Sequence, residues 1–217
     1  MPQPEGTRDN LPQIDVFSDI VCPWCFVGSE RLEQVLRSAG EEAAAVTYHP
    51  FFLMPDTPPE GLDIQEYLRK RYRADPRSMF AQVEAAARAS GLTLDLIRQP
   101  RTYPTVRAHT LLRQALEKGT QRELVRALFR VYFQEARDIS DVEVLAELAT
   151  QHGFSLEEAK RLVTDPDELA LTEQETEESQ ALGIRGVPFF VFNGKFAISG
   201  AQPESVFKDA LERAKHV

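Results

Sequence analysis

Hydrophobic and polar positions near the start of the chain follow a strand–helix–strand order. Ile14 to Ser18 is a short strand-like run, residues 23–38 have the apolar spacing of an amphipathic helix, and residues 44–53 are rich in Val, Tyr and Phe. Gly40 stands where the helix is expected to end. A strand, a helix and a second strand in this order predict two parallel strands joined by a right-handed crossover.

The middle of the chain, from Leu62 to Leu182, has helical spacing almost throughout. Glycines are expected just after helix ends, and Asp-Pro pairs or Ser/Thr-x-x-Glu capping boxes are expected at helix starts. The predicted ends are at Gly91, Gly119, Gly153 and Gly183, and the predicted starts are at Asp75-Pro76, Thr120 with Glu123, Ser140 with Glu143, Ser155 with Glu158, and Asp165-Pro166.

After Gly183 the strand pattern returns. Residues 188–192 and 195–199 are β-rich, and Asn193-Gly194 joins them. This predicts a β-hairpin, because both loop positions tolerate positive φ. Residues 203–214 then form an amphipathic helix. Its expected inward face is Val206, Phe207, Ala210 and Leu211.

The order of these elements predicts an α/β protein whose sheet is built from both ends of the chain. We expect one discontinuous domain, residues 13–56 and 183–217, with an all-helical domain inserted at residues 57–182. Residues 1–12 are polar and contain several prolines, so we expect a flexible leader there.

Composition and charge exclude several classes of function. The 217 residues include 34 acidic and 25 basic side chains, giving a formal net charge of −9. A phosphate-binding surface is therefore not expected, which argues against nucleic acid as a partner. The chain shows no apolar stretch long enough to span a membrane and no signal-peptide pattern at its start. We therefore expect a cytoplasmic protein with no membrane partner.

The candidate chemistry lies at Cys22 and Cys25, the two cysteines of the chain, spaced Cys-x-x-Cys between the first strand and the first helix. At a helix start, Cys22 meets unpaired N–H groups and the positive end of the helix dipole, which favour its thiolate. Cys25 lies one turn later, where it can form a disulfide or resolve a mixed one. Dithiol–disulfide exchange is the leading interpretation, because two cysteines in the cytosol rarely form a structural disulfide.

Two alternatives for the cysteines are a zinc site and an inert buried pair. Structural zinc takes four ligands, and the histidines lack the usual paired spacing, so no metal is expected. They are His49, His109, His152 and His216.

Residues beside the cysteines and a distant proline add to the candidate site. Pro23 has a φ suited to the first helical turn, and Trp24 either covers the disulfide or contacts substrate. Pro188 stands at the start of a strand, where a trans bond is the common case. A cis bond there would expose the backbone of Val187 to pair with an incoming peptide or thiol ligand.

These features together resemble the DsbA-type branch of the thioredoxin superfamily. The matching features are Phe-Ser-Asp-Ile-Val-Cys-Pro-Trp-Cys, Pro50-Phe51-Phe52-Leu53, Ala108-His109 and Val187-Pro188, in family order between Ile14 and Ala214. Within this branch the chain is most similar to the FrnE-like group, whose cousins are 2-hydroxychromene-2-carboxylate isomerases and kappa-class glutathione transferases.

The resemblance implies a thioredoxin-like fold with an inserted all-helical domain. It also implies that Cys22 is the nucleophile, that Cys25 is the resolving thiol, and that a cis Val187–Pro188 bond faces them. The cousins usually carry serine where Cys22 stands, so a real dithiol argues for redox exchange. They also carry Asn-Thr before Ala-His. This chain has Pro104-Thr105-Val106-Arg107 before Ala108-His109, which argues against the same glutathione contacts.

Two further residues are weaker candidates. Asp19, three residues before Cys22, could transfer a proton or tune the thiol, although an exposed loop aspartate is the commoner case. His109 could line the cleft and contact substrate, although a histidine hydrogen-bonded within a helix interface is more usual. His49, on the second strand, is expected to be structural. Phe26, Phe51 and Phe189 could wall a groove, but core packing is more frequent.

We therefore expect a DsbA-like protein-disulfide oxidoreductase or isomerase acting on protein or low-molecular-weight thiols and disulfides. Its redox centre would be the Cys22–Cys25 disulfide, with no other cofactor required and glutathione as a candidate co-substrate. The alternatives are a glutathione-dependent isomerase or transferase and a non-catalytic, chaperone-like peptide-binding module. The direction of electron transfer and the choice between monomer and homodimer stay open.

Overall fold

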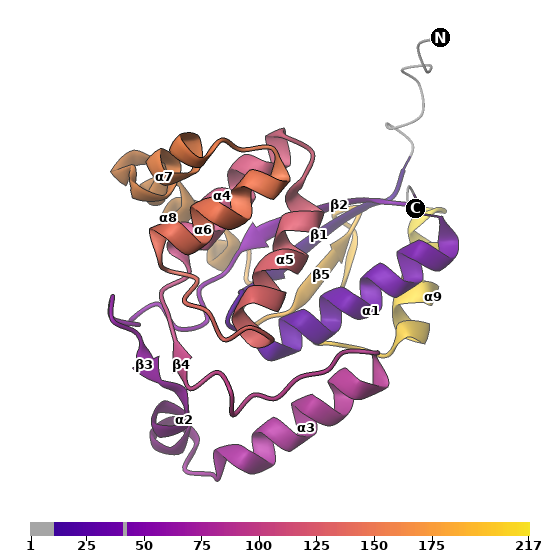
Figure 1. Ribbon diagram of the computed structural model, residues 1–217. Coiled ribbons are helices and arrows are strands. Elements are labelled where there is room, and N and C mark those ends of the chain that lie inside the picture. Colours follow the sequence, from indigo (N-terminus) through magenta and orange to yellow (C-terminus); the bar gives the residue numbers. More distant parts are fainter. Residues whose placement is uncertain (1–10, 41–42) are drawn as a thin grey trace.

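The computed structural model describes residues 11–40 and 43–217, so the expected leader at residues 1–12 lies almost entirely outside the described residues. The chain is a mixed α/β protein (Figure 1), as predicted. Its elements in order are β1 (Gln13–Ser18), α1 (Pro23–Ala39), β2 (Ala45–Pro50), β3 (Leu62–Asp63), α2 (Ile64–Tyr72), α3 (Pro76–Ala89), β4 (Arg101–Thr102), α4 (Val106–Glu117), α5 (Gln121–Phe133), α6 (Val142–Ala149), a short 3-10 helix (Thr150–His152), α7 (Leu156–Thr164), α8 (Pro166–Ala181), β5 (Phe189–Phe192), β6 (Phe196–Ser199) and α9 (Glu204–Ala214).

The main sheet has the strand order β2-β1-β5-β6. Strands β1 and β2 are parallel, with Ile14 opposite Val46, which confirms the predicted strand–helix–strand unit. Strands β5 and β6 form the predicted antiparallel hairpin, and Asn193 and Gly194 both have positive φ. The sheet therefore joins the N-terminal and C-terminal parts of the chain, and the segment from α2 to α8 lies between them in sequence. The division into two domains stays a prediction.

Strand β2 lies at an edge of the sheet, and a side chain pairs with its backbone. The Gln121 amide accepts from the Tyr48 N–H at 2.8 Å and donates to the Tyr48 carbonyl at 2.9 Å. Gln121 is buried, so its amide replaces a neighbouring strand at this point. An exposed edge would otherwise present unpaired backbone groups to other chains.

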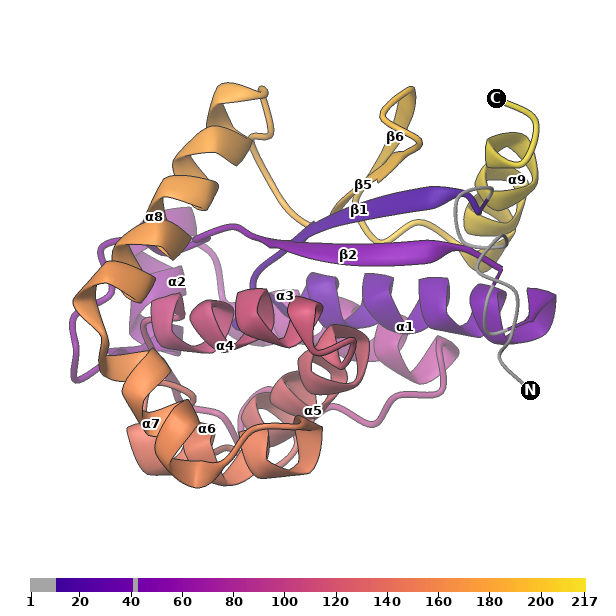
Figure 2. The ribbon, with the colours of Figure 1, turned by 90° about the horizontal axis from the view of Figure 1, so that it is seen from above.

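The helices cover the sheet and share one apolar core. Figure 2 shows α1 running alongside β1 and β2, while α8 passes close to β2. Helix α1 also packs against α9, α3 and α5. Phe26 of α1 stacks on Phe129 and Phe133 of α5, with ring centroids 5.1 and 5.9 Å apart. The cysteine helix is thus packed directly against the helical part of the chain.

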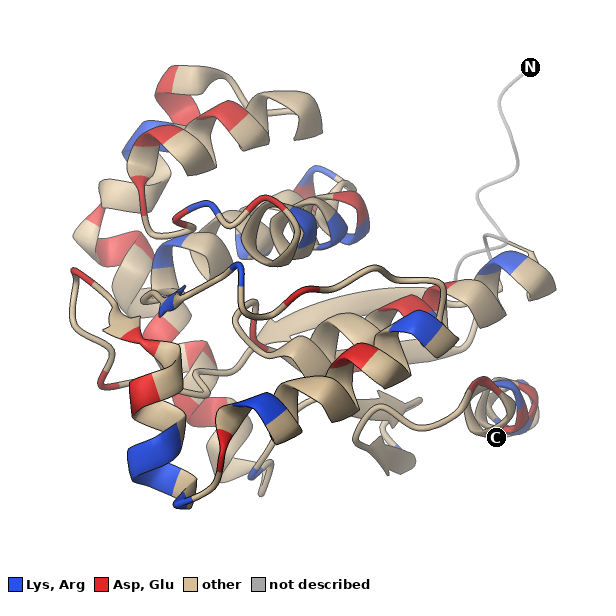
Figure 3. Cartoon of the chain, turned by 60° about the horizontal axis from the view of Figure 1, so that its bottom comes forward, with Lys and Arg blue, Asp and Glu red and all other residues tan. Residues whose placement is uncertain are grey.

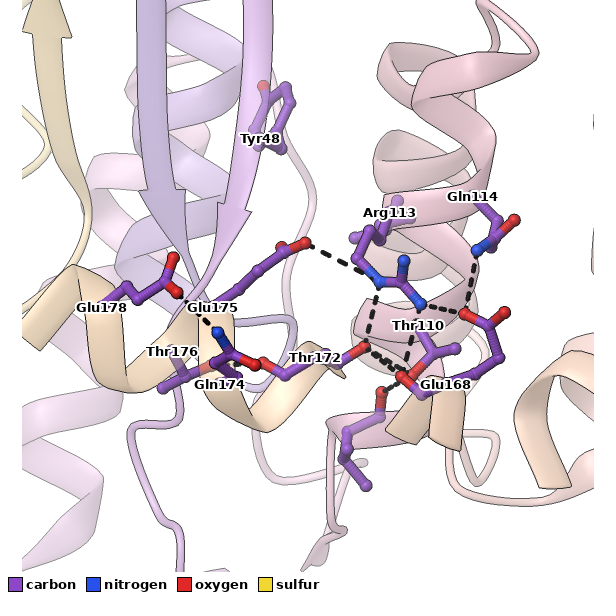
Figure 4. A network of polar contacts seen from close by, with 12 residues as sticks. Tyr48, Thr110, Arg113, Gln114, Glu168, Thr172, Gln174, Glu175, Thr176 and Glu178 are labelled. Atoms are coloured by element: carbon purple, nitrogen blue, oxygen red, sulfur yellow. Dashed lines mark hydrogen bonds and ion pairs between the residues drawn. The ribbon is translucent and has the colours of Figure 1, made fainter. Parts of the chain in front are cut away.

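Helix α8 attaches to α4 mainly through polar groups (Figure 4). Arg113 forms an ion pair with Glu168, and the hydroxyls of Thr110 and Thr172 lie 2.8 Å apart. The buried residues of α8 are Thr172, Thr176 and Ser179, each of which donates to a carbonyl one turn earlier. Such bonds satisfy buried hydroxyls, so this helix packs without an apolar stripe.

Several predicted helix starts are confirmed. Asp75 and Asp165 accept hydrogen bonds from the first helical turns of α3 and α8, and Ser155 with Glu158 forms the predicted capping box of α7. Among the predicted ends, Gly91, Gly119, Gly153 and Gly183 all have positive φ.

Two predicted capping boxes are wrong. Helix α6 begins one residue later than expected, because the Asp141 carboxylate, rather than Ser140, accepts from the Glu143 N–H at 2.7 Å. Thr120 precedes α5 but does not cap it, because its hydroxyl donates to the His152 carbonyl at 2.8 Å. The first error arises because the adjacent carboxylate of Asp141 caps the helix in place of Ser140, and the second because the partner of Thr120 is remote in sequence.

Three other details differ from prediction. Strand β2 ends at Pro50 rather than near Leu53. Val206 was expected to face inward but is 37% exposed. The two-residue strands β3 and β4 were not predicted, because they are too short to show a period of two. Over the described ranges, no helix combines the length and apolar character needed to cross a bilayer.

Candidate active site

Cys22 stands at the junction between β1 and helix α1. It is the residue just before the first helical turn, with extended backbone angles, and Pro23 lies within that turn. The N–H groups of Cys25 and Phe26 donate to the Cys22 carbonyl at 3.0 and 3.3 Å. Cys22 therefore stands at the helix end where the dipole favours negative charge, as predicted. Only 4% of the residue is exposed, and it lines a groove.

The loop before β5 brings Val187 and Pro188 to the Cys22 thiol. The Val187–Pro188 peptide bond is cis, as the resemblance implied. The Cys22 thiol donates a weak hydrogen bond to the Val187 carbonyl over 3.9 Å. The Gly200 N–H donates to the Pro188 carbonyl at 2.8 Å, which attaches this loop to the end of the hairpin. The loop before β5, near the C-terminal end of the chain, thus contacts Cys22, near the N-terminal end.

Helix α1 approaches this loop closely at Gly28. A Cβ atom at Gly28 would lie 3.1 Å from the Pro188 ring and 3.1 Å from the Phe190 ring. Because these contacts are tighter than ordinary van der Waals distances, only glycine lets the helix and the loop pack together undisturbed. Gly28 was not predicted from the sequence, where its one signal was a glycine inside a regular helical pattern.

Cys25 differs sharply from Cys22 in its surroundings. It is completely buried, and the two thiols are free rather than joined. Burial raises the pKa of the Cys25 thiol well above its usual value, and the neighbouring Cys22 adds to the rise. Hydrogen bonding to the Asp19 backbone and the Ser18 hydroxyl acts in the opposite direction. Cys25 is therefore a protonated thiol at neutral pH, shielded from solvent.

Ser18 is a second residue that the sequence analysis missed. Its Oγ is buried and has no hydrogen-bond partner of ordinary geometry among the described residues. It nevertheless lies near enough to Cys25 for its hydroxyl to lower the pKa of that thiol. No sequence signal distinguished this serine, because its effect on the pKa of Cys25 depends on how the fold places that thiol relative to β1.

Asp19 is buried, although an exposed loop aspartate was the commoner expectation. It is 1% exposed, and its carboxylate accepts from the Leu53 N–H at 2.8 Å and lies 3.3 Å from His109 Nε2. Its carbonyl accepts from the Cys22 N–H at 3.1 Å. One aspartate thus connects the cysteine loop, the segment after β2 and helix α4. Its side chain is buried because these three segments close over it.

His109 is also buried, at 3% exposure, and does not line the groove. Its ring lies 5.9 Å from that of Phe52, measured between centroids, and its Nε2 faces Asp19. The structure thus gives His109 a hydrogen bond within an interface rather than a place in the groove. The interface joins α4 to the cysteine loop rather than two helices.

A groove of about 590 Å³ runs from Cys22 toward α2 and α3. Its lining is mostly apolar and aromatic, and includes Pro23, Trp24, Phe51 and Val187 from the predicted set. Trp24 is 37% exposed, so its ring forms part of the surface beside the cysteines. Apolar grooves with a few polar groups are the usual form of ligand sites.

The remaining aromatic and histidine candidates are structural. Phe26 is part of the core, and Phe189 packs against a small cluster that contains Phe51. His49 stacks on the Phe17 ring and bonds to Asp15 at 2.8 Å, away from the cysteines. Within the described ranges, no three His, Cys, Asp or Glu side chains gather in a way that would hold a metal ion.

Comparison with known proteins assigns the chain to a family. A family model for the DSBA-like thioredoxin domain matches residues 13–212. Among curated proteins, the uncharacterized protein YwbO of Bacillus subtilis (strain 168) is 29% identical over 212 residues. The match covers 91% of this chain and 94% of YwbO.

Solved structures share this fold. A probable DsbA oxidoreductase, SCO1869 from Streptomyces coelicolor, is 33% identical with a TM-score of 0.84, covering 94% of this chain and 89% of that one. The cytosolic disulfide reductase DsbM from Pseudomonas aeruginosa, solved with GSH, is 19% identical with a TM-score of 0.67, covering 94% and 100%. The chain therefore has a thioredoxin-like fold and belongs to the DsbA-like thioredoxin family.

Proposed function

We propose that the protein is a thiol–disulfide oxidoreductase that exchanges the Cys22–Cys25 dithiol with disulfides of its substrates. The observation that carries the proposal is the unequal placement of the two thiols. Cys22 lines the groove at a helix N-terminus, whereas Cys25 is fully buried and does not line it. An attacking thiol must reach a foreign disulfide, while a resolving thiol needs to reach only the first cysteine.

The exchange proceeds in two balanced steps. The Cys22 thiolate attacks one sulfur of a substrate disulfide, which forms a Cys22–substrate disulfide and releases the other sulfur as a thiolate. The Cys25 thiolate then attacks Cys22, which forms the Cys22–Cys25 disulfide and releases the second substrate thiolate. The enzyme dithiol loses two electrons and two protons, and the substrate gains them as two thiols. The reverse sequence oxidises a substrate dithiol.

Recognition of substrate would use the backbone of Val187. Its carbonyl lies beside the Cys22 sulfur, and its N–H makes no hydrogen bond among the described residues. An extended segment carrying the substrate cysteine can pair with such a free backbone edge, as strands do. In this proposal, Pro188 presents that edge, Pro23 preserves the helix start, and Trp24 contacts the substrate.

Glutathione and a cytosolic location are part of the proposal. DsbM is described as a cytosolic disulfide reductase and was solved with GSH, which supports a thiol of this kind as the co-substrate that returns the Cys22–Cys25 disulfide to the dithiol. Two glutathione thiols would supply two electrons and two protons and leave as glutathione disulfide. A reducing compartment would favour this direction.

The test is reduction of a protein disulfide such as insulin, followed by measurement of the reduction potential against glutathione. We expect turnover by the native chain and none by Cys22→Ser. Cys25→Ser is the matched variant, because it leaves the attacking thiol in place and should accumulate a covalent mixed disulfide detectable by mass. Full activity of Cys22→Ser would contradict the mechanism. Turnover of a hydroxychromene carboxylate with glutathione, without any disulfide exchange, would replace it with an isomerase.

A further inference from the structure

The groove beside Cys22 differs in charge from the rest of the molecule. The chain has 34 acidic and 25 basic residues, yet no Asp or Glu is among the described residues that line the groove. The charged residues lining it are Arg71 and Arg185. A net-negative protein therefore has a substrate groove whose local charge is positive. Such a region attracts anionic ligands and repels cationic ones.

The two arginines reach the groove from different parts of the chain. Arg185 lies in the loop that carries Val187, two residues before it. Arg71 lies in the last turn of α2, where Arg69 and Lys70 also stand, and Figure 3 shows these basic residues gathered at one end of that helix. The groove is thus flanked by a guanidinium on the cis-proline loop and another on the helical segment.

Neither guanidinium is paired with a carboxylate of the described residues. Both arginines are exposed, and no ion pair or hydrogen bond of either side chain is present among the described residues. The guanidinium carbon of Arg71 lies 5.7 Å from the Tyr72 ring centroid, a contact that leaves its N–H donors free. By contrast, the neighbouring Lys70 is paired with Glu66 at 2.6 Å. The donors of Arg71 and Arg185 are therefore available to a ligand.

The apolar part of the groove points to a polypeptide. Large apolar side chains stand exposed along it, with Trp24 at 37%, Leu53 at 42% and Tyr72 at 56% exposure. Large apolar side chains exposed along one groove are typical of an interaction site. Together with the free backbone of Val187, this groove suits an extended segment with several apolar side chains better than a compact polar tripeptide.

We propose that the groove selects cysteine-containing polypeptide segments in which an acidic residue flanks apolar residues, with Arg71 and Arg185 binding the acidic side chain. This inference rests on the proposed disulfide exchange and specifies its substrate. A guanidinium binds a carboxylate through paired N–H donors, which gives direction as well as attraction. The bound carboxylate would place the neighbouring substrate disulfide over Cys22.

The test compares matched peptide disulfides that differ at one residue. Three peptides carry the same apolar residues and disulfide, with Glu, Gln or Lys at the flanking position, and kcat/KM is measured for each. We expect the Glu peptide to exceed the Gln peptide by about fivefold, as a partly exposed ion pair would give, with the Lys peptide slowest. The preference should fall toward unity in about 1 M salt, where screening shortens the Debye length to about 3 Å.

The double variant Arg71→Gln with Arg185→Gln should lose the preference between the Glu and Gln peptides. Arg69→Gln is the control for the α2 part of this change, because it removes one positive charge from an exposed position on α2 that does not line the groove. It should keep the preference.

Equal rates for the Glu and Gln peptides with the native chain would overturn the inference while leaving the exchange activity intact. A preference unchanged in the double variant would also overturn it. Faster turnover of glutathione disulfide than of all three peptides would overturn it as well. Absence of turnover with every peptide and with insulin would instead overturn the proposed function itself, so the two failures are distinguishable.

Discussion

The carboxylate of Asp19 and the imidazole of His109 form a buried pair, 3.3 Å apart, between the cysteine loop and helix α4. Asp19 is 1% exposed and His109 is 3% exposed. The other Asp19 oxygen accepts from the Leu53 N–H, and Leu53 lines the substrate groove. The aspartate therefore supports two sides of the site at once: the loop that carries Cys22 and the segment that forms the groove wall.

We predict that Asp19→Ala raises KM more than it lowers kcat, because the Leu53 segment loses its anchor while the thiols stay in place. Leaving the Leu53 N–H and His109 unpaired should also destabilise the fold by about 2–4 kcal/mol, measured by urea unfolding. Asp19→Asn keeps an acceptor for the Leu53 N–H, so its KM should lie close to that of the native chain.

The same pair of variants tests whether Asp19 transfers a proton, the role for which it was a candidate. If Asp19→Asn lost as much kcat as Cys22→Ser while KM stayed constant, the carboxylate would act in proton transfer rather than in positioning. His109→Gln is the companion variant, since an amide can still bond to Asp19. It should affect stability more than turnover, because His109 does not line the groove.

The pH dependence of the second step should reveal the buried thiol. Burial raises the pKa of Cys25, and this contribution persists in the mixed disulfide, whereas the effect of a charged Cys22 disappears there. Because only the thiolate attacks, resolution should accelerate by about tenfold for each pH unit while Cys25 is mostly protonated. Rapid acid quenching and mass analysis would show the mixed disulfide accumulating at low pH. A flat rate between about pH 6 and pH 9 would contradict this assignment.

Ser18→Ala should slow the same step. The Ser18 hydroxyl lowers the pKa of Cys25, so its removal should leave a smaller fraction of Cys25 as the attacking thiolate and lower the resolution rate. The fold should be unaffected, because the hydroxyl has no other partner among the described residues. Ser29→Ala removes a similarly buried hydroxyl, on α1 rather than on β1, and should leave the rate unchanged. Equal slowing in both variants would indicate a general packing effect.

The ion pair between Glu33 and Arg122 should be important for stability. Arg122 of α5 donates from Nε to Glu33 Oε1 at 3.1 Å and from Nη2 to Glu33 Oε2 at 2.9 Å, which joins α5 to α1. The Glu33 side chain is only 5% exposed. Arg122→Met would leave this carboxylate buried without its partner, at a cost on the order of 3 kcal/mol. For a chain of this size, that corresponds to a fall in Tm of about 6–12 °C.

Arg37→Met provides the comparison for this prediction. Arg37 pairs with Glu30 at 2.7 Å, but its side chain is 40% exposed, so the loss should stay below about 1 kcal/mol. Similar Tm values for the two variants, measured by calorimetry, would show that the buried pair contributes no more than the exposed one.

Local signals in the sequence were sufficient to predict most elements and to single out Cys22 and Cys25 as a candidate redox pair. Helical and strand periodicity, the Asn193-Gly194 turn and the Asp-Pro helix starts depend on neighbours within a few residues, so they can be read without the fold. The Cys-x-x-Cys spacing before a helix is local in the same sense. The cis bond before Pro188 came from the family resemblance, since nothing local distinguished it from a trans bond.

The tertiary structure alone decided what surrounds that pair. Asp19 is buried because α4 and the segment after β2 close over it, and Ser18 matters because the Cys25 thiol lies beside it. The charge of the groove depends on Arg71 and Arg185, which are more than a hundred residues apart in sequence. The sequence by itself determined which elements form and that the cysteine pair stands at the start of a helix. Only the packing of remote segments determined their burial, partners and local charge, because those quantities depend on distances that no local pattern contains.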